Sequence, residues 1–135
     1  MKTMRLVGLT ALFASHMAIA ALPCDGFEIK LKNNLADDLL VTTIKLHGGK
    51  LSPGGIQKLD SKTEQVFTVN NTTNLPMTGE LVFHTITLPS KTVKIHFDLA
   101  NNGLTCNHTD TSPASDYSVS SSRSLNQVNY TIYNR

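Results

Sequence analysis

The chain has 135 residues, with 12 Lys and Arg, 10 Asp and Glu, and no Trp. Two basic residues, Lys2 and Arg5, lie in an N-terminal segment that we expect to be removed, which leaves 12 − 2 = 10 basic against 10 acidic residues. A formally neutral chain without a basic cluster lacks the electrostatic footprint of a nucleic-acid-binding protein, so we expect no nucleic-acid partner.

Residues 1–20 have the three parts of a secretory signal peptide. A basic start is followed by an apolar run from Leu6 to Phe13 and by Ala18 and Ala20, spaced as an A-x-A cleavage site. The apolar run is shorter than the ~20 residues that a membrane-spanning helix needs. We therefore expect a cleaved, bacterial-type signal peptide and a single secreted or periplasmic domain over residues 21–135 with no transmembrane segment.

The two cysteines, Cys24 and Cys106, both belong to the mature chain. An even number of cysteines in an exported protein predicts a disulfide bond. The pair would close a ring of 83 residues (24 to 106), for which the chain-entropy model assigns ~4 to 5 kcal/mol of stabilisation. The wide spacing favours a structural bond over a redox pair.

Alternation of apolar and polar residues dominates the mature chain and predicts strands. We expect them over 27–32, 39–47, 64–70, 79–88, 92–99 and 127–134, and we expect 100–124 to be a mobile loop with at most one edge strand near 116–120. Seven or eight short strands with no convincing helix predict an all-β fold, a single small antiparallel β-sandwich or barrel. The predicted core comprises Phe27, Ile29, Leu31, Val41, Ile44, Phe67, Val69, Phe83, Ile95, Phe97, Val128 and Ile132.

Two histidines, His84 and His96, lie on the arms of a predicted hairpin around Pro89-Ser90. If the numbers of paired residues sum to 179, the imidazoles lie on opposite faces; if they sum to 180, His84 faces His96. The second register separates polar from apolar side chains better and is favoured. It would bring two metal ligands together, with Asp98 as a candidate third ligand for zinc.

The glycine-rich stretch after residue 46 predicts a surface loop, and loops often carry binding residues. The candidate binding residues in it are His47, Gly48, Gly49, Lys50 and Ser52. No nucleophile motif or cofactor motif is visible in the chain, so we expect a protein without enzymatic activity and without a cofactor. The alternative of a hydrolase requires a concave pocket around His96 and Asp98.

The order of elements over residues 27–51 is a short strand ending in Asn-Asn, a polar turn, a long apolar strand and a Gly-Lys pair. In this layout the chain resembles the opening of the aegerolysins, small β-sandwich proteins whose family role is to bind membrane lipids. The resemblance implies an immunoglobulin-like or aegerolysin-like sandwich. We therefore expect an exported protein that binds a surface partner, namely a lipid head group, a glycan, or a host or envelope protein; the alternative is a metal-binding protein using His84 and His96.

Overall fold

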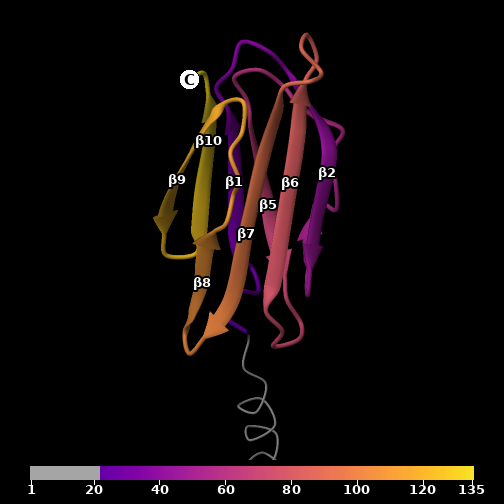
Figure 1. Cartoon of the computed structure of the whole chain (residues 1–135). Helices are drawn as coiled ribbons and strands as arrows, with labels where there is room; N and C mark the ends of the chain where they lie inside the picture. Colours follow the sequence, from indigo (N-terminus) through magenta and orange to yellow (C-terminus); the bar gives the residue numbers. More distant parts are fainter. Residues whose placement is uncertain (1–21) are drawn as a thin grey trace, which may run out of the picture.

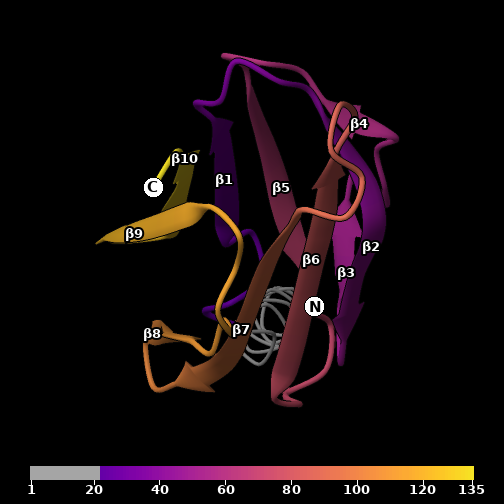
Figure 2. The same cartoon turned by 45° about the horizontal axis from the view of Figure 1, so that its top comes forward.

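A computed structural model describes residues 22–135, and the expected signal peptide lies outside this range. The described chain forms ten strands in two five-stranded sheets that face each other (Figures 1 and 2). The first sheet has the order β3-β5-β1-β10-β9 and the second the order β4-β2-β6-β7-β8. The strands are β1 (Glu28–Asn33), β2 (Leu39–His47), β3 (Lys50–Ser52), β4 (Lys58–Leu59), β5 (Glu64–Asn70), β6 (Met77–Thr85), β7 (Thr92–Asn102), β8 (Thr105–Asp110), β9 (Ser118–Ser124) and β10 (Gln127–Tyr133).

The predicted all-β fold with one disulfide bond, Cys24–Cys106, is confirmed. All strand pairs are antiparallel except β1 with β10, which run parallel in the middle of the first sheet. None of residues 22–135 belongs to a helix that could cross a membrane.

Period-two alternation directs the apolar side chains of both sheets into one core between them. In β1, Ile29 and Leu31 are fully buried while Lys30 and Lys32 face outward. Ten of the twelve predicted core residues are buried, and Val41 and Ile44 pack against the core in a partly buried state. Leu39, Leu81, Val93, Leu99 and Tyr130 complete the core between the sheets.

Strand β2 contains an irregularity that explains why Val41 and Ile44, three residues apart, both contact the core. Val41 pairs with Phe83 but Thr43 pairs with Val82, so an extra residue, Thr42, is inserted between them. Such a bulge reverses which alternate side chains face inward. The odd-numbered residues face the core before the bulge and the even-numbered ones after it.

Two segments that we predicted as loops contain strands. Residues 50–52 form β3, whose Leu51 is buried against the core. Residues 105–110 form β8 within the expected loop 100–124, and β9 over residues 118–124 corresponds to the one edge strand expected near 116–120. These are edge strands or short strands that bury few side chains, so their composition carries almost no period-two hydrophobic signal, and the backbone ladder holds them.

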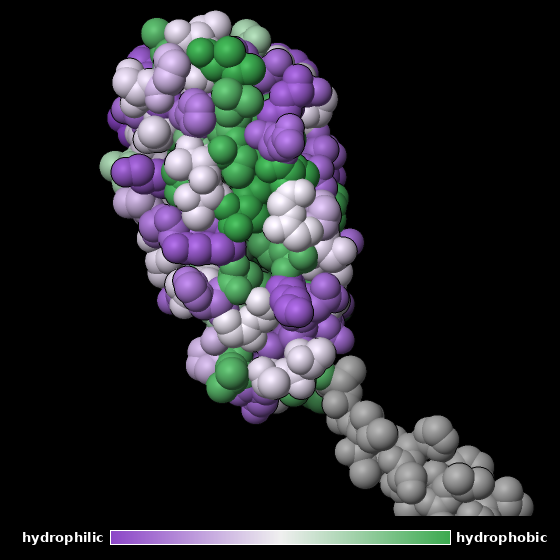
Figure 3. All heavy atoms as spheres, turned by 90° about the vertical axis from the view of Figure 1, so that its right-hand side faces the viewer, coloured by the Kyte–Doolittle hydropathy of each residue, from purple (hydrophilic) through white to green (hydrophobic). Residues whose placement is uncertain are grey.

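The side of the sandwich where β2, β3 and β4 meet carries a strip of apolar surface (Figure 3). Val41, Ile44, Leu46 and Ile56 pack against the core in a partly buried state. β4 covers β2 only at Leu39 and Leu40, so beyond these residues no described strand pairs with the outer edge of β2. The strip therefore consists of side chains at the border of the core, which the open edge of the sandwich leaves partly exposed.

Candidate functional site

The outer face of the second sheet holds the two predicted metal-ligating histidines, but the hairpin register keeps them apart. Paired residue numbers in β6 and β7 sum to 176: His84 pairs with Thr92, and His96 pairs with Glu80. Both proposed registers are therefore wrong, although the predicted division into a polar and an apolar face is right. The two histidines lie four residues apart along the strands, about 13 Å, which is too far for one shared ion.

The hairpin has a longer tip than predicted because Ile86 and Thr87 leave the ladder. The backbone N–H of Ile86 donates to the carbonyl of Asp38, and the backbone N–H of Thr87 donates to Asp37 Oδ2 at 3.2 Å. The Thr87 hydroxyl also donates to Asp37, and this bond holds the pKa of the Asp37 carboxyl below its ordinary value. A distant loop thus determines the register.

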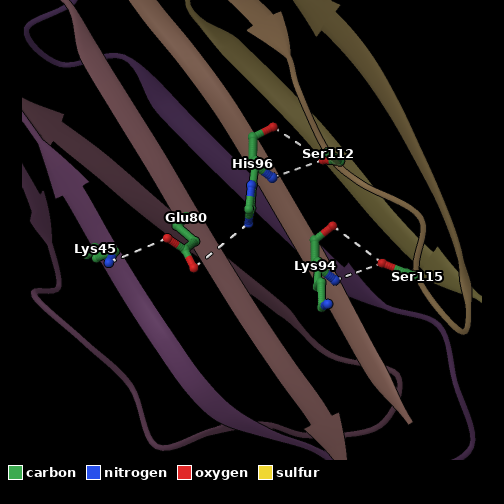
Figure 4. Close-up of polar contacts among 6 residues, drawn as sticks. All are labelled: Lys45, Glu80, Lys94, His96, Ser112 and Ser115. Carbon is green, nitrogen blue, oxygen red and sulfur yellow. Dashed lines mark hydrogen bonds and ion pairs between the residues drawn. The ribbon is translucent and has the colours of Figure 1, made fainter.

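Glu80 is the centre of the polar contacts on this face (Figure 4). Its carboxylate lies 3.5 Å from Lys45 Nζ and 3.9 Å from His96 Nε2. His84 Nδ1 lies 2.9 Å from the Thr42 hydroxyl, and Asp98 Oδ1 lies 3.4 Å from the Thr78 hydroxyl. Partly exposed contacts of this kind contribute little to stability.

Within residues 22–135, no group of three or more potential metal-ligating side chains comes together. Two surface pockets, of about 300 and about 150 Å³, include neither His96 nor Asp98 in their linings. The described residues thus do not assemble the proposed ligand set of His84, His96 and Asp98, and neither of these two pockets is the concave site that a hydrolase would require at His96 and Asp98.

A segment that we call the strap, Thr111–Asp116, runs along the edge of β7 beyond the end of β8. The Ser115 hydroxyl accepts from the Lys94 N–H at 2.8 Å, and the Ser112 hydroxyl accepts from the His96 N–H at 3.0 Å (Figure 4). Asp116 Oδ2 accepts from the Thr92 N–H at 2.7 Å, a bond that holds the pKa of Asp116 below its ordinary value. Backbone bonds join the two ends of the strap to β7, from the Thr111 N–H to the His96 carbonyl and from the Asp116 N–H to the Thr92 carbonyl, and side chains make the bonds between them.

The predicted binding loop is a tight crossing between the two sheets. His47 is the last residue of β2, Lys50 and Ser52 bound β3, and Gly48 and Gly49 connect them. A Cβ on Gly48 would lie 2.5 Å from the Pro76 carbonyl oxygen, and Gly48 has a φ of +85°. Glycine is required there because the backbone approaches closely and adopts a left-handed conformation.

This crossing lies at one end of the sandwich, which we call the disulfide end. It comprises the Cys24–Cys106 bond and the connections β2–β3, β5–β6, β7–β8 and β9–β10. Asn101 accepts from the Cys24 N–H at 2.7 Å and donates to the Asn71 side chain at 2.8 Å. Arg123 donates to the Cys106 carbonyl at 3.1 Å. These bonds join the N-terminal segment, the β5–β6 connection and the ends of β7, β8 and β9 to one another.

Three leucines on separate connections of the disulfide end are exposed to solvent. Leu104 is 98% exposed, Leu125 is 80% exposed and Leu75 is 56% exposed. Figure 1 shows the β5–β6 and β7–β8 connections at the tip of this end, with the β9–β10 turn set back from it. Leu104 and Leu125 occupy two-residue hairpin turns, where Gly, Asn and Asp are the usual residues.

Nothing in the hydrophobic periodicity distinguished these leucines from core residues. A usable sequence signal was their neighbours: Leu104 follows Asn102-Gly103, and Leu125 stands between Ser124 and Asn126. A large apolar residue inside a turn-type sequence has no core to face.

A polar pair, the half-buried His108 and the buried Tyr130, lies inside the same half of the sandwich. His108 Nε2 lies 2.7 Å from the Tyr130 hydroxyl, and the His108 ring packs against Phe27 and Phe97. Burial, followed by the nearby Arg123 guanidinium, lowers the pKa of His108. Burial, followed by the nearby Asp110 carboxylate, raises the pKa of Tyr130. The pair bridges the two sheets, and its role is structural.

Comparison with known proteins supports the fold alone. No family model and no curated protein matches the chain. The fold is similar to that of IP-1A from Alcaligenes faecalis, with a TM-score of 0.59 and 13% identity over 84% of this chain and 94% of that chain. It is also similar to that of the RahU protein, solved in complex with a TRIS molecule, with a TM-score of 0.56 and 13% identity over 81% of this chain and 96% of that chain.

Proposed function

We propose that this protein is an exported, non-enzymatic binding protein that attaches to a lipid membrane surface through the disulfide end. The observation that carries the proposal is the exposure of Leu75 and Leu104 on the two connections at the tip of this end, with Leu125 exposed on a third connection set back from it. Single exposed apolar residues are ordinary on protein surfaces. Three on connections of one end, two of them in turns that normally hold polar residues, favour contact with an apolar phase.

The rigidity of this end supports the same role. The disulfide bond and the Asn71–Asn101 contact hold the connections before any partner arrives, so little conformational entropy is lost on binding. The disulfide bond also agrees with export to an oxidising compartment. The resemblance of residues 27–51 to the aegerolysins, whose family role is to bind membrane lipids, supports the choice of a lipid surface over a glycan or a protein.

The test is co-sedimentation with vesicles of phosphatidylcholine and of phosphatidylcholine with phosphatidylglycerol. Transfer of one leucine side chain out of water contributes about 1.5 kcal/mol or more, so each Leu→Ser substitution should weaken binding about tenfold. The test variant is Leu75→Ser/Leu104→Ser/Leu125→Ser.

The control is Ile86→Ser/Leu88→Ser, which removes two apolar side chains of 43% and 49% exposure from the β6–β7 hairpin at the opposite end. We expect the control to bind like the unaltered protein. Absence of binding to both vesicle types, or equal loss in the test and control variants, would contradict the proposal.

A further inference from the structure

The second half of β2 has an open edge. The β3–β4 connection reaches β2 at Val41, whose N–H donates to the Gln57 carbonyl at 3.0 Å, and β4 pairs with β2 only at Leu39 and Leu40. Within residues 22–135, the backbone of Thr43–His47 bonds only to β6. Alternate N–H and C=O groups of a strand in an antiparallel sheet point to opposite sides. This edge therefore presents donors and acceptors at the spacing of an added strand.

Apolar side chains lie beside this edge. After the bulge at Thr42 the even-numbered residues face the core, so Ile44 and Leu46 belong to the apolar strip on this side of the sandwich. Both are only partly buried, and Figure 3 shows the strip running along the molecule. A strand added to β2 would place every second side chain next to Ile44 and Leu46. It would remove apolar surface from water and close the edge of the sandwich.

The other side chains of this edge face outward and determine which charge an added strand should carry. Thr43, Lys45 and His47 alternate with the apolar pair on the outer face of the sheet. Lys45 Nζ lies 3.5 Å from the Glu80 carboxylate, and half of the Lys45 side chain stays exposed. Opposed residues of neighbouring strands have Cβ atoms about 5 Å apart, so a carboxylate opposite Lys45 would form a cross-strand ion pair. The edge thus favours a strand in which apolar residues alternate with acidic ones.

A second copy of this chain fits the edge less well. Two copies related by a two-fold axis would pair β2 with β2 in antiparallel fashion. The register that sets Ile44 opposite Leu46 of the second copy also sets Lys45 opposite Lys45, and like charges in that position are destabilising. The register with Leu46 opposite Leu46 sets Lys45 opposite His47. The register with Ile44 opposite Ile44 sets Leu46 opposite Thr42, which belongs to the bulge. None of these registers brings a carboxylate to Lys45.

We propose that the open edge of β2 over Thr43–His47 binds an extended segment of another protein in which apolar residues alternate with Asp or Glu. The segment joins the second sheet as an added strand. Its backbone pairs with β2, its apolar side chains cover Ile44 and Leu46, and one acidic side chain lies opposite Lys45. The inference goes beyond the proposed membrane attachment and does not depend on it, because it uses none of the three exposed leucines.

The test is titration of the isotope-labelled protein with peptides of about seven residues, the length of a short strand. In one peptide valine alternates with glutamate, and in the second valine alternates with lysine. The third is the glutamate peptide with every backbone nitrogen methylated, so that it cannot donate to β2. We expect the glutamate peptide to shift the amide signals of residues 43–47 and to slow their hydrogen exchange. The lysine peptide should bind several-fold more weakly, and the methylated peptide should not bind.

Reversal of one charge on the protein tests the pairing with Lys45. Lys45→Glu should weaken binding of the glutamate peptide by up to about tenfold and strengthen binding of the lysine peptide. Lys94→Glu makes the same change of charge on the outer face of the same sheet, but on β7, two strands away from the edge. It is the control and should bind both peptides like the unaltered protein. A thermal unfolding midpoint for each variant separates loss of binding from loss of the fold.

Four outcomes would overturn the proposal. No peptide shifts residues 43–47, or the methylated peptide binds as well as its parent, or Lys45→Glu changes the affinity for both peptides in the same direction. The fourth is a dimer in sedimentation of the unaltered protein with slow amide exchange at residues 43–47, because a second copy would then occupy the edge. Leu75→Ser/Leu104→Ser/Leu125→Ser should still bind the glutamate peptide, so the peptide and vesicle experiments fail separately.

Discussion

Replacement of Gly79 by Ala tests how closely the two central strands of the second sheet pack. Gly79 lies in β6 opposite Phe97 of β7, and a Cβ at Gly79 would lie 2.0 Å from Phe97 Cζ and 2.3 Å from Cε2. Phe97 is fully buried and its ring also packs against His108, so the ring has no free space to enter. Overpacking of this kind costs about 1 to 3 kcal/mol.

The assay is thermal and urea unfolding of Gly79→Ala, Phe97→Leu and the double variant. For a domain of this size, 1 kcal/mol corresponds to a midpoint shift of about 3 to 5 °C, so a cost of about 1 to 3 kcal/mol should lower the midpoint of Gly79→Ala by roughly 3 to 15 °C. Phe97→Leu removes the far edge of the ring, so Gly79→Ala should cost clearly less in that background.

The matched control is Gly55→Ala, because a Cβ there has no atom within 4 Å. The control should change stability by only a few tenths of a kcal/mol. The reasoning is refuted if Gly79→Ala is as stable as the control, or if its cost is unchanged when Phe97 is Leu.

Two further predictions concern the disulfide bond and the half-buried His108. Cys24→Ala/Cys106→Ala should lower the free energy of unfolding by about 4.5 kcal/mol, which follows from the chain separation of 82 residues between the cysteines and is measurable by urea unfolding; a cost below about 1 kcal/mol would show that the unfolded chain is already compact there. His108 has a folded-state pKa below its ordinary value of 6.5, so the unfolded state binds more protons and stability should fall as pH drops through 6.5. His108→Gln should reduce this dependence, whereas the exposed His47→Gln should leave it unchanged; equal pH profiles for unaltered protein and His108→Gln would contradict the assignment.

Much of the candidate site could not be inferred from the sequence. Alternation in 79–88 and 92–99 correctly separated the buried face, with Phe83 and Ile95, from the outer face, with His84 and His96. The pairing of the two strands was wrong because Asp37 and Asp38, some fifty residues away, bind the hairpin tip. A hydrogen bond to a distant loop leaves no trace in the local pattern.

Two leucines show that residue type alone does not decide which side chains are buried. Leu99 and Leu104 are the same residue type five positions apart in the chain, yet Leu99 is 1% exposed and Leu104 is 98% exposed. The strap contains Thr, Ser and Asp residues, and we predicted it as part of a mobile loop. Its serine hydroxyls accept hydrogen bonds from backbone N–H groups at the edge of β7. Strand propensity does not predict contacts of this kind.

The sequence alone determined the all-β class, the disulfide bond and most of the core, because these depend on period-two hydrophobicity and on the presence of two cysteines. Only the tertiary structure decided the hairpin register, the exposure of Leu75, Leu104 and Leu125 on connections of one end, and the open edge of β2. Each of these depends on which segments lie together in space, and contacts between distant segments leave no periodic signal in the sequence.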